Sequence, residues 1–269
     1  MLDVGRWKFA AFMITERLKL TVTYDGSPFD GWQSQSTANG VQDHIESAFL
    51  AVAGIRLRIH GSGRTDAGVH AMGQIAHADV PRGRLAPATW IAALNANLPP
   101  AIRIIRVIRV SSVRVRDGEG GFHSRFSAKG KRYIYRLWNA TYMHPLEIGR
   151  AWHVPRELDL ALLREAAALL VGRHDFARFT AKRRGQIQTD TVRTIHRIRV
   201  QTRGPLITLT FEGDGFLYKM VRLLTGTIVR VAERRAPVSF ITDLLSPHLQ
   251  TRTHFMAVAG GLYLSRVFY

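Results

Sequence analysis

A single carboxylate stands in the middle of a glycine-rich segment in the first third of the chain. Residues 60–70 read HGSGRTDAGVH, with Asp66 between Gly63 and Gly68. Such segments either hold a phosphate with their backbone or present one side chain on a turn. A presented Asp66 could act as a nucleophile or as a base, whereas the simpler alternative is an aspartate that caps its own turn.

Both common phosphate-binding patterns fail in this segment. The dinucleotide fingerprint G-x-G-x-x-G begins with Gly61 and Gly63, but Asp66 takes the place of its third glycine and would repel a pyrophosphate. The P-loop G-x-x-x-x-G-K-[ST] ends on a lysine and a hydroxyl, where this chain has Val69 and His70. The sequence therefore predicts a turn that presents Asp66.

The composition indicates a folded protein with a polyanionic partner. The chain has 269 residues, enough for two packed cores, and 46% of them are hydrophobic. Lys and Arg outnumber Asp and Glu by 38 to 20, which gives a net charge of +18. Because self-repulsion at this charge opposes compaction, we expect a nucleic-acid partner. The chain has no cysteine, which excludes disulfides and thiolate sites and fits a cytoplasmic protein.

Hydrophobic periodicity predicts strands and helices in two successive halves of the chain. In the first half we expect strands at 17–24, 55–60, 74–80 and 102–110, and helices at 41–54 and 86–99. In the second half we expect strands at 131–139 and 261–269, a hairpin that turns over 201–204, a loop at 174–179, and helices at 158–172 and 216–233.

The run RVRDGEGG at 114–121 shows no periodicity and predicts a boundary between the halves. We therefore predict an N-terminal extension (1–16), an α+β domain that carries Asp66 (17–115) and a second α+β domain (122–269). No stretch is apolar for long enough to cross a membrane, and the short apolar run near the N-terminus lacks the cleavage site of a signal peptide.

Several motifs match one family. GRTDAGVH (63–70) resembles the signature of the tRNA pseudouridine synthase A family, and YDGSPFDGWQSQ (24–35) is similar to its YDG-x4-GWQ-Q opening. Further blocks follow in family order: LNANLP (94–99), FHSRFSA (122–128), RYIY (132–135), GRHDFARF (172–179), TVR (191–193), MVRLLTG (220–226) and GLYL (261–264). One departure precedes MVR, where the family often has His-His and this chain has Tyr218 and Lys219.

The resemblance implies a fold and an activity. The family has two α+β domains, each a mainly antiparallel sheet with helices on one face, and a basic active-site cleft between them. Its members are homodimeric isomerases that convert uridines at positions 38–40 of the tRNA anticodon arm to pseudouridine by base flipping. They need no metal and no cofactor, because the uracil leaves C1′ at N1 and rejoins it at C5 without gain or loss of atoms.

The catalytic residue that the resemblance implies is Asp66, with Arg222 of MVRLLTG as its cationic partner. A helix over 216–233 would place Lys219, Arg222 and Gly226 on one face, so that a basic stripe faces the cleft. Without the motif, Arg222 would be interpreted as a solvated helix charge.

The resemblance also implies residues that bind the substrate. Tyr133 in RYIY matches the tyrosine that stacks against the target uracil, whereas Tyr135 is the core member of that block. Arg64 matches an arginine that helps to hold the nucleotide flipped out. Arg125 and Phe126 in FHSRFSA are expected to line the mouth of the cleft.

Other classes of protein fit less of the sequence. A non-catalytic RNA-binding module explains the charge but not an aspartate in a basic cleft, and a metal-dependent nuclease would need several clustered carboxylates. His60, His70 and His77 follow no metal-binding pattern. A synthase that acts on another RNA shares the same chemistry. The sequence leaves open which of the three uridines is preferred, and whether Asp66 is nucleophile or base.

Overall fold

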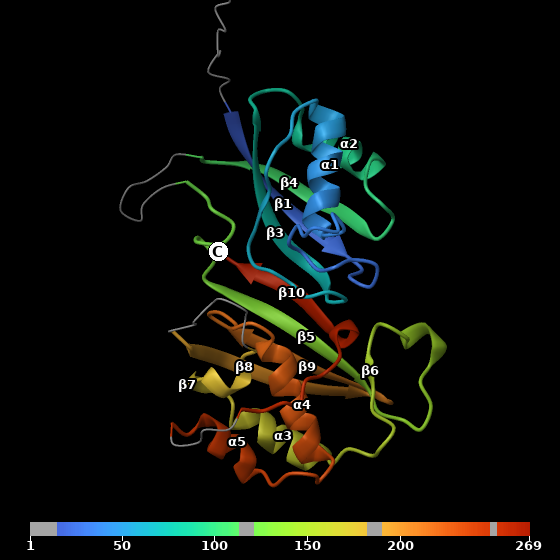
Figure 1. Cartoon of the computed structure of the whole chain (residues 1–269), viewed down its shortest axis with the longest axis vertical. Helices are drawn as coiled ribbons and strands as arrows, with labels where there is room; N and C mark the ends of the chain where they lie inside the picture. Colours follow the sequence, from blue (N-terminus) through green and yellow to red (C-terminus); the bar gives the residue numbers. More distant parts are fainter. Residues whose placement is uncertain (1–14, 113–120, 182–189, 248–251) are drawn as a thin grey trace, which may run out of the picture.

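The computed structural model describes residues 15–112, 121–181, 190–247 and 252–269, in which strands and helices are mixed (Figure 1). The first half contains β1 (Thr15–Tyr24), α1 (Val41–Ala53), β2 (His60–Gly61), β3 (His70–Pro81), α2 (Pro87–Ala96) and β4 (Ile102–Val110). The second half contains β5 (Gly130–Trp138), η2 (Pro145–Glu147), β6 (Trp152–His153), α3 (Leu160–Ala168), β7 (Gly172–Asp175), η3 (Ala177–Phe179), β8 (Val192–Arg203), β9 (Leu206–Gly213), α4 (Met220–Ala232), α5 (Ser239–Leu245), η4 (Ala259–Gly261) and β10 (Leu262–Phe268).

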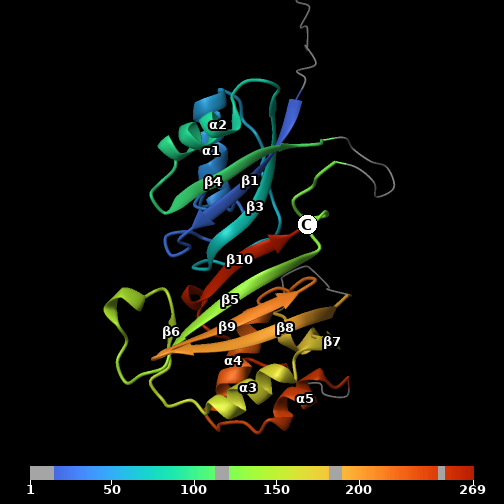
Figure 2. The same cartoon turned by 180° about the vertical axis from the view of Figure 1, so that it is seen from behind.

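The strands of both halves form one continuous sheet. Its order is β4-β1-β3-β10-β5-β9-β8-β7, with β2 paired to β3 and β6 paired to β5 (Figures 1 and 2). Strand β10 pairs in parallel with β3, where Tyr263 lies opposite His70, and it pairs antiparallel with β5. The β5–β6 pair is also parallel, and the remaining pairs are antiparallel. The predicted α+β class with mainly antiparallel pairing is therefore confirmed.

The division into two domains stays a prediction. The C-terminal strand β10 pairs with β3 of the first half, so the two halves share a sheet and do not have separate ones. The predicted boundary at 114–121 lies almost wholly outside the described residues, as do residues 1–14 of the predicted extension. Strand β1 begins at Thr15, two residues before the predicted start of the first domain.

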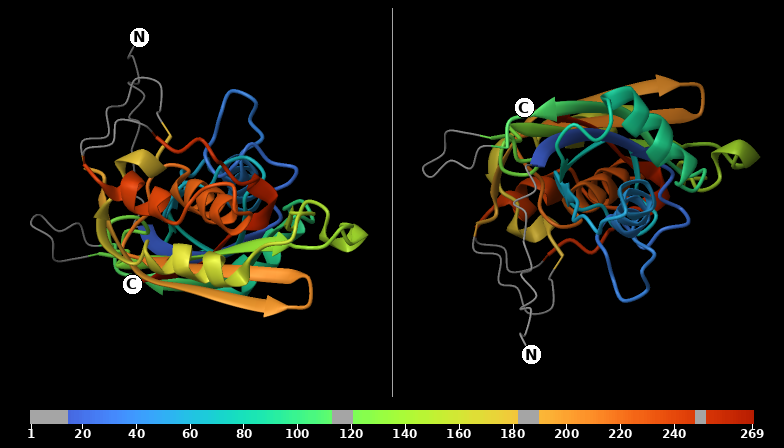
Figure 3. Two further views of the ribbon diagram at one scale, coloured as in Figure 1. Left: turned by 90° about the horizontal axis from the view of Figure 1, so that it is seen from below. Right: turned by 90° about the horizontal axis from the view of Figure 1, so that it is seen from above.

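Strand β1 and helix α1 fold as their periodic patterns predict. Leu18, Leu20 and Val22 are fully buried on one face of β1, and α1 ends at Gly54, whose left-handed φ of 66° suits a glycine after a helix. Helices α1 and α4 lie on the same side of the sheet (Figure 3). Helix α4 is the most buried of the helices, and it packs against α3 and η3.

Several predicted elements are wrong in extent. The helix expected over 158–172 spans only Leu160–Ala168, and β8 runs to Arg203, into the turn expected at 201–204. Within 55–60 only His60 is in a strand, because the Ile59 N–H donates to the Glu46 carboxylate at 2.9 Å instead of to a neighbouring strand. The helix expected over 216–233 begins at Met220, since Lys219 before it is left-handed with φ 61°. Part of the loop expected at 174–179 is the end of β7.

In the described part of the chain no helix is long and apolar enough to cross a bilayer.

Candidate active site

Asp66 lies on a turn between β2 and β3, as the glycines around it predict. The Val69 N–H donates to the Asp66 carbonyl oxygen at 3.1 Å and closes the turn, and Gly68 adopts a φ of 76° that suits glycine. The Asp66 side chain is 22% exposed and lines a cleft of about 1530 Å³ between the two halves. The turn therefore presents a carboxylate to a large open space.

The segment that opens with YDG supports this turn from behind. Gly31 has a φ of 97°, and a Cβ on it would lie 2.5 Å from the Thr65 carbonyl oxygen. That same oxygen accepts a hydrogen bond from the Trp32 N–H at 3.1 Å, and the Thr65 hydroxyl bonds the buried Tyr24 hydroxyl at 2.8 Å. A Cβ on Gly26 would collide with the Val69 carbonyl oxygen. These glycines allow the two backbones to touch, which fixes where Asp66 stands.

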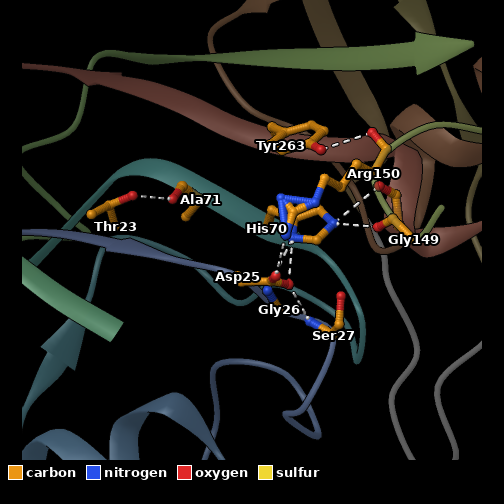
Figure 4. Close-up of polar contacts among 10 residues, drawn as sticks. Thr23, Asp25, Gly26, Ser27, His70, Ala71, Gly149, Arg150 and Tyr263 are labelled. Carbon is orange, nitrogen blue, oxygen red and sulfur yellow. Dashed lines mark hydrogen bonds and ion pairs between the residues drawn. The ribbon is translucent and has the colours of Figure 1, made fainter. Parts of the chain in front are cut away.

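His70 joins the end of the turn to the second half of the chain (Figure 4). Its ring is 3% exposed, and Nδ1 accepts the Gly26 N–H at 3.0 Å. Nε2 lies 2.9 Å from the Gly149 carbonyl oxygen and 3.0 Å from that of Gly260, so this nitrogen carries the hydrogen. Asp25 lies 3.1 Å from Nδ1 and makes an ion pair only when the ring is protonated.

Tyr263 of β10 covers the face of this histidine. The two rings stack with centroids 4.6 Å apart, and the Tyr263 hydroxyl donates to the Arg150 carbonyl oxygen at 2.7 Å (Figure 4). The Arg150 guanidinium lies 3.5 Å from the Asp25 carboxylate. One buried ring thus connects the Asp66 turn, the YDG segment and β10.

Arg222 reaches Asp66 from the second half. Its Nη1 lies 3.2 Å from Asp66 Oδ2, and its Nε donates to the Ala257 carbonyl oxygen at 2.8 Å. Helix α4 can lie close to the segment that holds Ala257 because Gly226 has no side chain. A Cβ at this position would collide with the Phe255 carbonyl oxygen. Lys219 lines the cleft and Arg222 contacts Asp66, but the two do not share a helix face as predicted, because Lys219 precedes α4 in a left-handed conformation. Gly226 faces buried backbone.

Tyr133 lies on β5 in the middle of the shared sheet, opposite Leu264 on one side and Phe211 on the other. It is 8% exposed, lines the cleft, and meets the Phe216 ring edge-on at 5.1 Å. Burial raises the pKa of its phenol, and the nearby Tyr24 and Asp66 raise it further, so Tyr133 stays neutral.

The neighbouring tyrosine of RYIY has the structural position that the family pattern implies. Tyr135 is fully buried, and its hydroxyl donates to the Val258 carbonyl oxygen at 2.6 Å. Tyr133 and Tyr135 point to the same side of β5, but the hydroxyl of Tyr135 is occupied by backbone and that ring lies outside the cleft lining.

The remaining predicted residues lie toward the open part of the cleft. Arg64 is exposed, and its Nε donates to Gln33 at 3.0 Å. Arg125 and Phe126 are exposed, the latter by 76%, with the guanidinium 5.7 Å from the ring centroid. The structure thus brings all six predicted site residues together, five in the lining and Arg222 behind Asp66.

The lining also contains residues that the sequence did not single out. Lys131 and Phe216 flank Tyr133, and Leu262 lies at the start of β10. Seven basic side chains line the cleft against two carboxylates: Arg58, Arg64, Arg125, Lys131, Arg193, Lys219 and Arg252, against Asp66 and Asp214. Lys131, Arg193 and Leu262 lie within or beside blocks that match the family, which was a usable signal for them, and Lys219 was already predicted to face the cleft.

Metal ligands are not gathered in the described residues, which contain no group of three or more His, Asp or Glu side chains placed to hold an ion. His60 and His77 stack ring on ring at 5.0 Å, and His70 is committed to the bonds already described. That the chemistry needs no metal or cofactor stays a prediction.

A carboxylate on a turn, paired with an arginine beside a buried tyrosine in a basic cleft, defines a site built to act on a polyanion. Comparison with known proteins names the class. The family model described as tRNA pseudouridine synthase matches residues 20–116 and 166–269, and the chain belongs to that family.

Individual relatives agree over nearly the whole length. The chain is 42% identical to a tRNA pseudouridine synthase A of Akkermansia muciniphila, over 94% of this chain and 95% of that protein. It is 38% identical to a protein of the same name from Geobacillus kaustophilus, over 95% of each. A chain of a solved Cbf5-Nop10-Gar1 complex aligns with 79% of this chain and 45% of its own at 13% identity, with a TM-score of 0.34.

Proposed function

We propose that this protein converts uridine to pseudouridine at positions 38–40 of the tRNA anticodon arm, with Asp66 as the catalytic group. Membership of the family makes it an isomerase that forms pseudouridine in tRNA. The observation that carries the assignment of Asp66 is its pairing: a carboxylate lines a basic cleft and lies 3.2 Å from an arginine of the other half. A carboxylate at this position weakens RNA binding, so a role in the chemistry is the better explanation for its presence.

The reaction rearranges one nucleotide. The bond between C1′ and N1 breaks, a bond between C1′ and C5 forms, and the hydrogen of C5 is replaced while N1 gains one. Asp66 acts either on C1′ as a nucleophile or on a proton as a base, and both roles use its carboxylate, which lies 3.2 Å from the Arg222 guanidinium. Tyr133 offers an aromatic face beside it, on which the detached uracil can turn.

The target base must leave its stack to reach Asp66. Extrusion costs a few kcal/mol, which stacking and basic contacts in the cleft offset. Arg64 stands two residues from Asp66 on the same turn, where it can hold the backbone of the flipped nucleotide. Arg125 and Phe126 offer a charge and a ring near the opening, suited to the flanking nucleotides.

Tritium release tests this function directly. The purified protein should release tritium from tRNA labelled at C5 of uridine, and replacement of uridines 38, 39 and 40 by cytidine should abolish the release. A chelator should leave the reaction of pre-folded tRNA intact, which separates it from a metal-dependent nuclease. Binding without release would leave only an RNA-binding module, and release that persists in the substituted tRNA would reject the proposed positions.

We also propose that the protein is a cytoplasmic homodimer, as its family resemblance implies. The segment between β5 and β6 projects from the sheet (Figure 1) and exposes apolar side chains: Tyr142 by 84%, Leu146 by 79% and Ile148 by 67%. Such a patch favours contact with another protein surface. Light scattering should give twice the chain mass, and Leu146→Glu should shift it toward one; a monomeric wild type would contradict the proposal.

A further inference from the structure

Lys131 crosses the cleft from the second half to the catalytic turn. It lies on β5 two residues before Tyr133, so both side chains are on one face of the strand, and both line the cleft. Its Nζ donates to the Ser62 carbonyl oxygen at 3.0 Å. Ser62 begins the segment that leads through Arg64 to Asp66. Arg222 contacts the same turn at its other end.

Bonds within the first half already hold the groups on either side of the peptide that Lys131 contacts. The Ser62 N–H donates to the Ile75 carbonyl oxygen at 2.7 Å, and its hydroxyl donates to Gln74 Oε1 at 2.6 Å. Gln74 Nε2 in turn donates to the Gly63 carbonyl oxygen at 2.9 Å. The hydrogen bond from Lys131 connects this segment to β5, the strand that carries Tyr133. It therefore fixes the position of the Asp66 turn relative to the Tyr133 ring.

Gly63 leaves the space that this lysine occupies. A Cβ on Gly63 would lie 2.5 Å from Lys131 Nζ and 3.6 Å from its Cε, with no other atom within 4 Å. Gly63 is not among the glycines with positive φ, so its backbone would accept alanine without strain. Glycine at residue 63 therefore leaves room for the Lys131 side chain and is not required by the backbone conformation of the turn.

We propose that Lys131 is a positioning residue for pseudouridine formation: its ammonium holds the Ser62–Gly63 peptide and so fixes Arg64 and Asp66 opposite Tyr133. This inference rests on the proposed function. An ammonium is suited to the task because its hydrogen bond to a carbonyl oxygen is charge-assisted and stronger than that of a neutral donor.

The charge on Lys131 gives the proposal a pH signature. Burial lowers the pKa of the Lys131 ammonium to about 8, with the charge of Arg125 as a second cause. Because the protonated form holds the turn, the single-turnover rate should fall as the pH rises through about 8. Other titratable or charged groups of the cleft lining near Lys131 are Arg58, His60, Arg64, Asp66, His123, Arg125 and Tyr133. Of these, the arginines keep their charge throughout.

The test compares single and double variants at saturating tRNA. Lys131→Met removes the ammonium and keeps the stem, and it should lower the single-turnover rate about tenfold to a hundredfold while tRNA affinity changes less than about threefold. Gly63→Ala should produce a loss of similar size by displacing Nζ. The double variant should be no slower than Lys131→Met, because both changes remove the same contact. Lys131→Arg should restore part of the rate.

The control is Lys129→Met, the same substitution on an exposed side chain outside the cleft lining. It should leave rate and pH profile as in the wild type, whereas Lys131→Met should lose the alkaline decline. Additive losses in the double variant, or a wild-type rate in Lys131→Met, would overturn the proposal. If Lys131→Met does not fold, Gly63→Ala and Lys131→Arg decide it alone. Absence of tritium release from the wild type would instead reject the proposed function.

Discussion

The two sides of the cleft are built in different ways. On one side, Arg64 and Asp66 stand on a turn that is held mainly through its backbone, by the YDG segment and by β3. On the other side, Tyr133 stands on a central strand and Arg222 in the first turn of a buried helix. Regular elements fix a side chain through many repeated bonds, whereas the turn depends on a few contacts from distant segments.

Because of this difference, substitutions on the two sides of the cleft should have different effects. A change at the turn can move Asp66 while the fold survives, so it should affect the reaction rate more than stability. A substitution in β5 or α4 leaves the backbone in place, so the loss in rate should reflect only the side-chain interaction that is removed. Substitutions on both sides therefore test whether the Asp66 turn is more easily displaced than β5 and α4.

The largest effect should come from Asp66→Asn. The variant keeps the size of the side chain and removes its charge, so pseudouridine formation should fall by more than about a thousandfold. Affinity for tRNA should persist or rise, because one negative charge leaves a basic cleft. Tritium release and filter binding measure the two quantities, with Asp243→Asn, an exposed carboxylate on α5, as control. A tenth of wild-type turnover in the Asp66 variant would reject its catalytic role.

Arg222→Ala should have the next largest effect, from the opposite side of the cleft. It removes the cation that holds the Asp66 carboxylate in place, and a misplaced catalytic group typically costs about a hundredfold in rate. Arg222→Lys should recover part of the loss, since a point charge replaces the guanidinium. Single-turnover rates on one tRNA measure both variants. The control Arg234→Ala removes an exposed arginine whose surface pair contributes little; equal losses there would refute the Asp66–Arg222 pair.

Tyr133→Ala should cost the stacking of one base, about 1–3 kcal/mol, or roughly fivefold to 150-fold in rate. Tyr133→Phe should stay within about threefold of the wild type, since the ring is what stacks. The pair of rates measures the contribution of the ring separately from that of the hydroxyl. If the Phe variant is as slow as the Ala variant, the hydroxyl and not the aromatic face is what matters.

The smallest effect should come from His70, which ties the turn to the second half. His70→Gln places a donor near the original Nε2 and can still bond the Gly149 and Gly260 carbonyl oxygens, whereas His70→Asn retains only the position of Nδ1. The Asn variant should lose about 1–3 kcal/mol of unfolding free energy and several-fold in rate, and the Gln variant less. Urea unfolding and tritium release provide the comparison; equal losses would mean that the bonds to the second half are unimportant.

Local pattern was sufficient for much of this molecule. The alternation of Leu18, Leu20 and Val22 predicted β1, and the glycines beside Asp66 predicted a presenting turn, because period and turn chemistry act over a few residues. Prediction failed where a side chain outside the segment bonds its backbone, or where one residue leaves the helical conformation. The Glu46 carboxylate takes the Ile59 N–H away from a strand, and the left-handed Lys219 delays the start of α4.

The family motifs identified Asp66, Tyr133 and Arg222 as members of one site, but no motif could predict how they meet. Asp66 and Arg222 are 156 residues apart and come together because β10 pairs with β3 on one edge and with β5 on the other. Every strand edge offers the same row of N–H and C=O groups, so a sequence does not specify which edges pair. Packing of the whole chain selects the pairing, and with it the distance between the aspartate and its arginine.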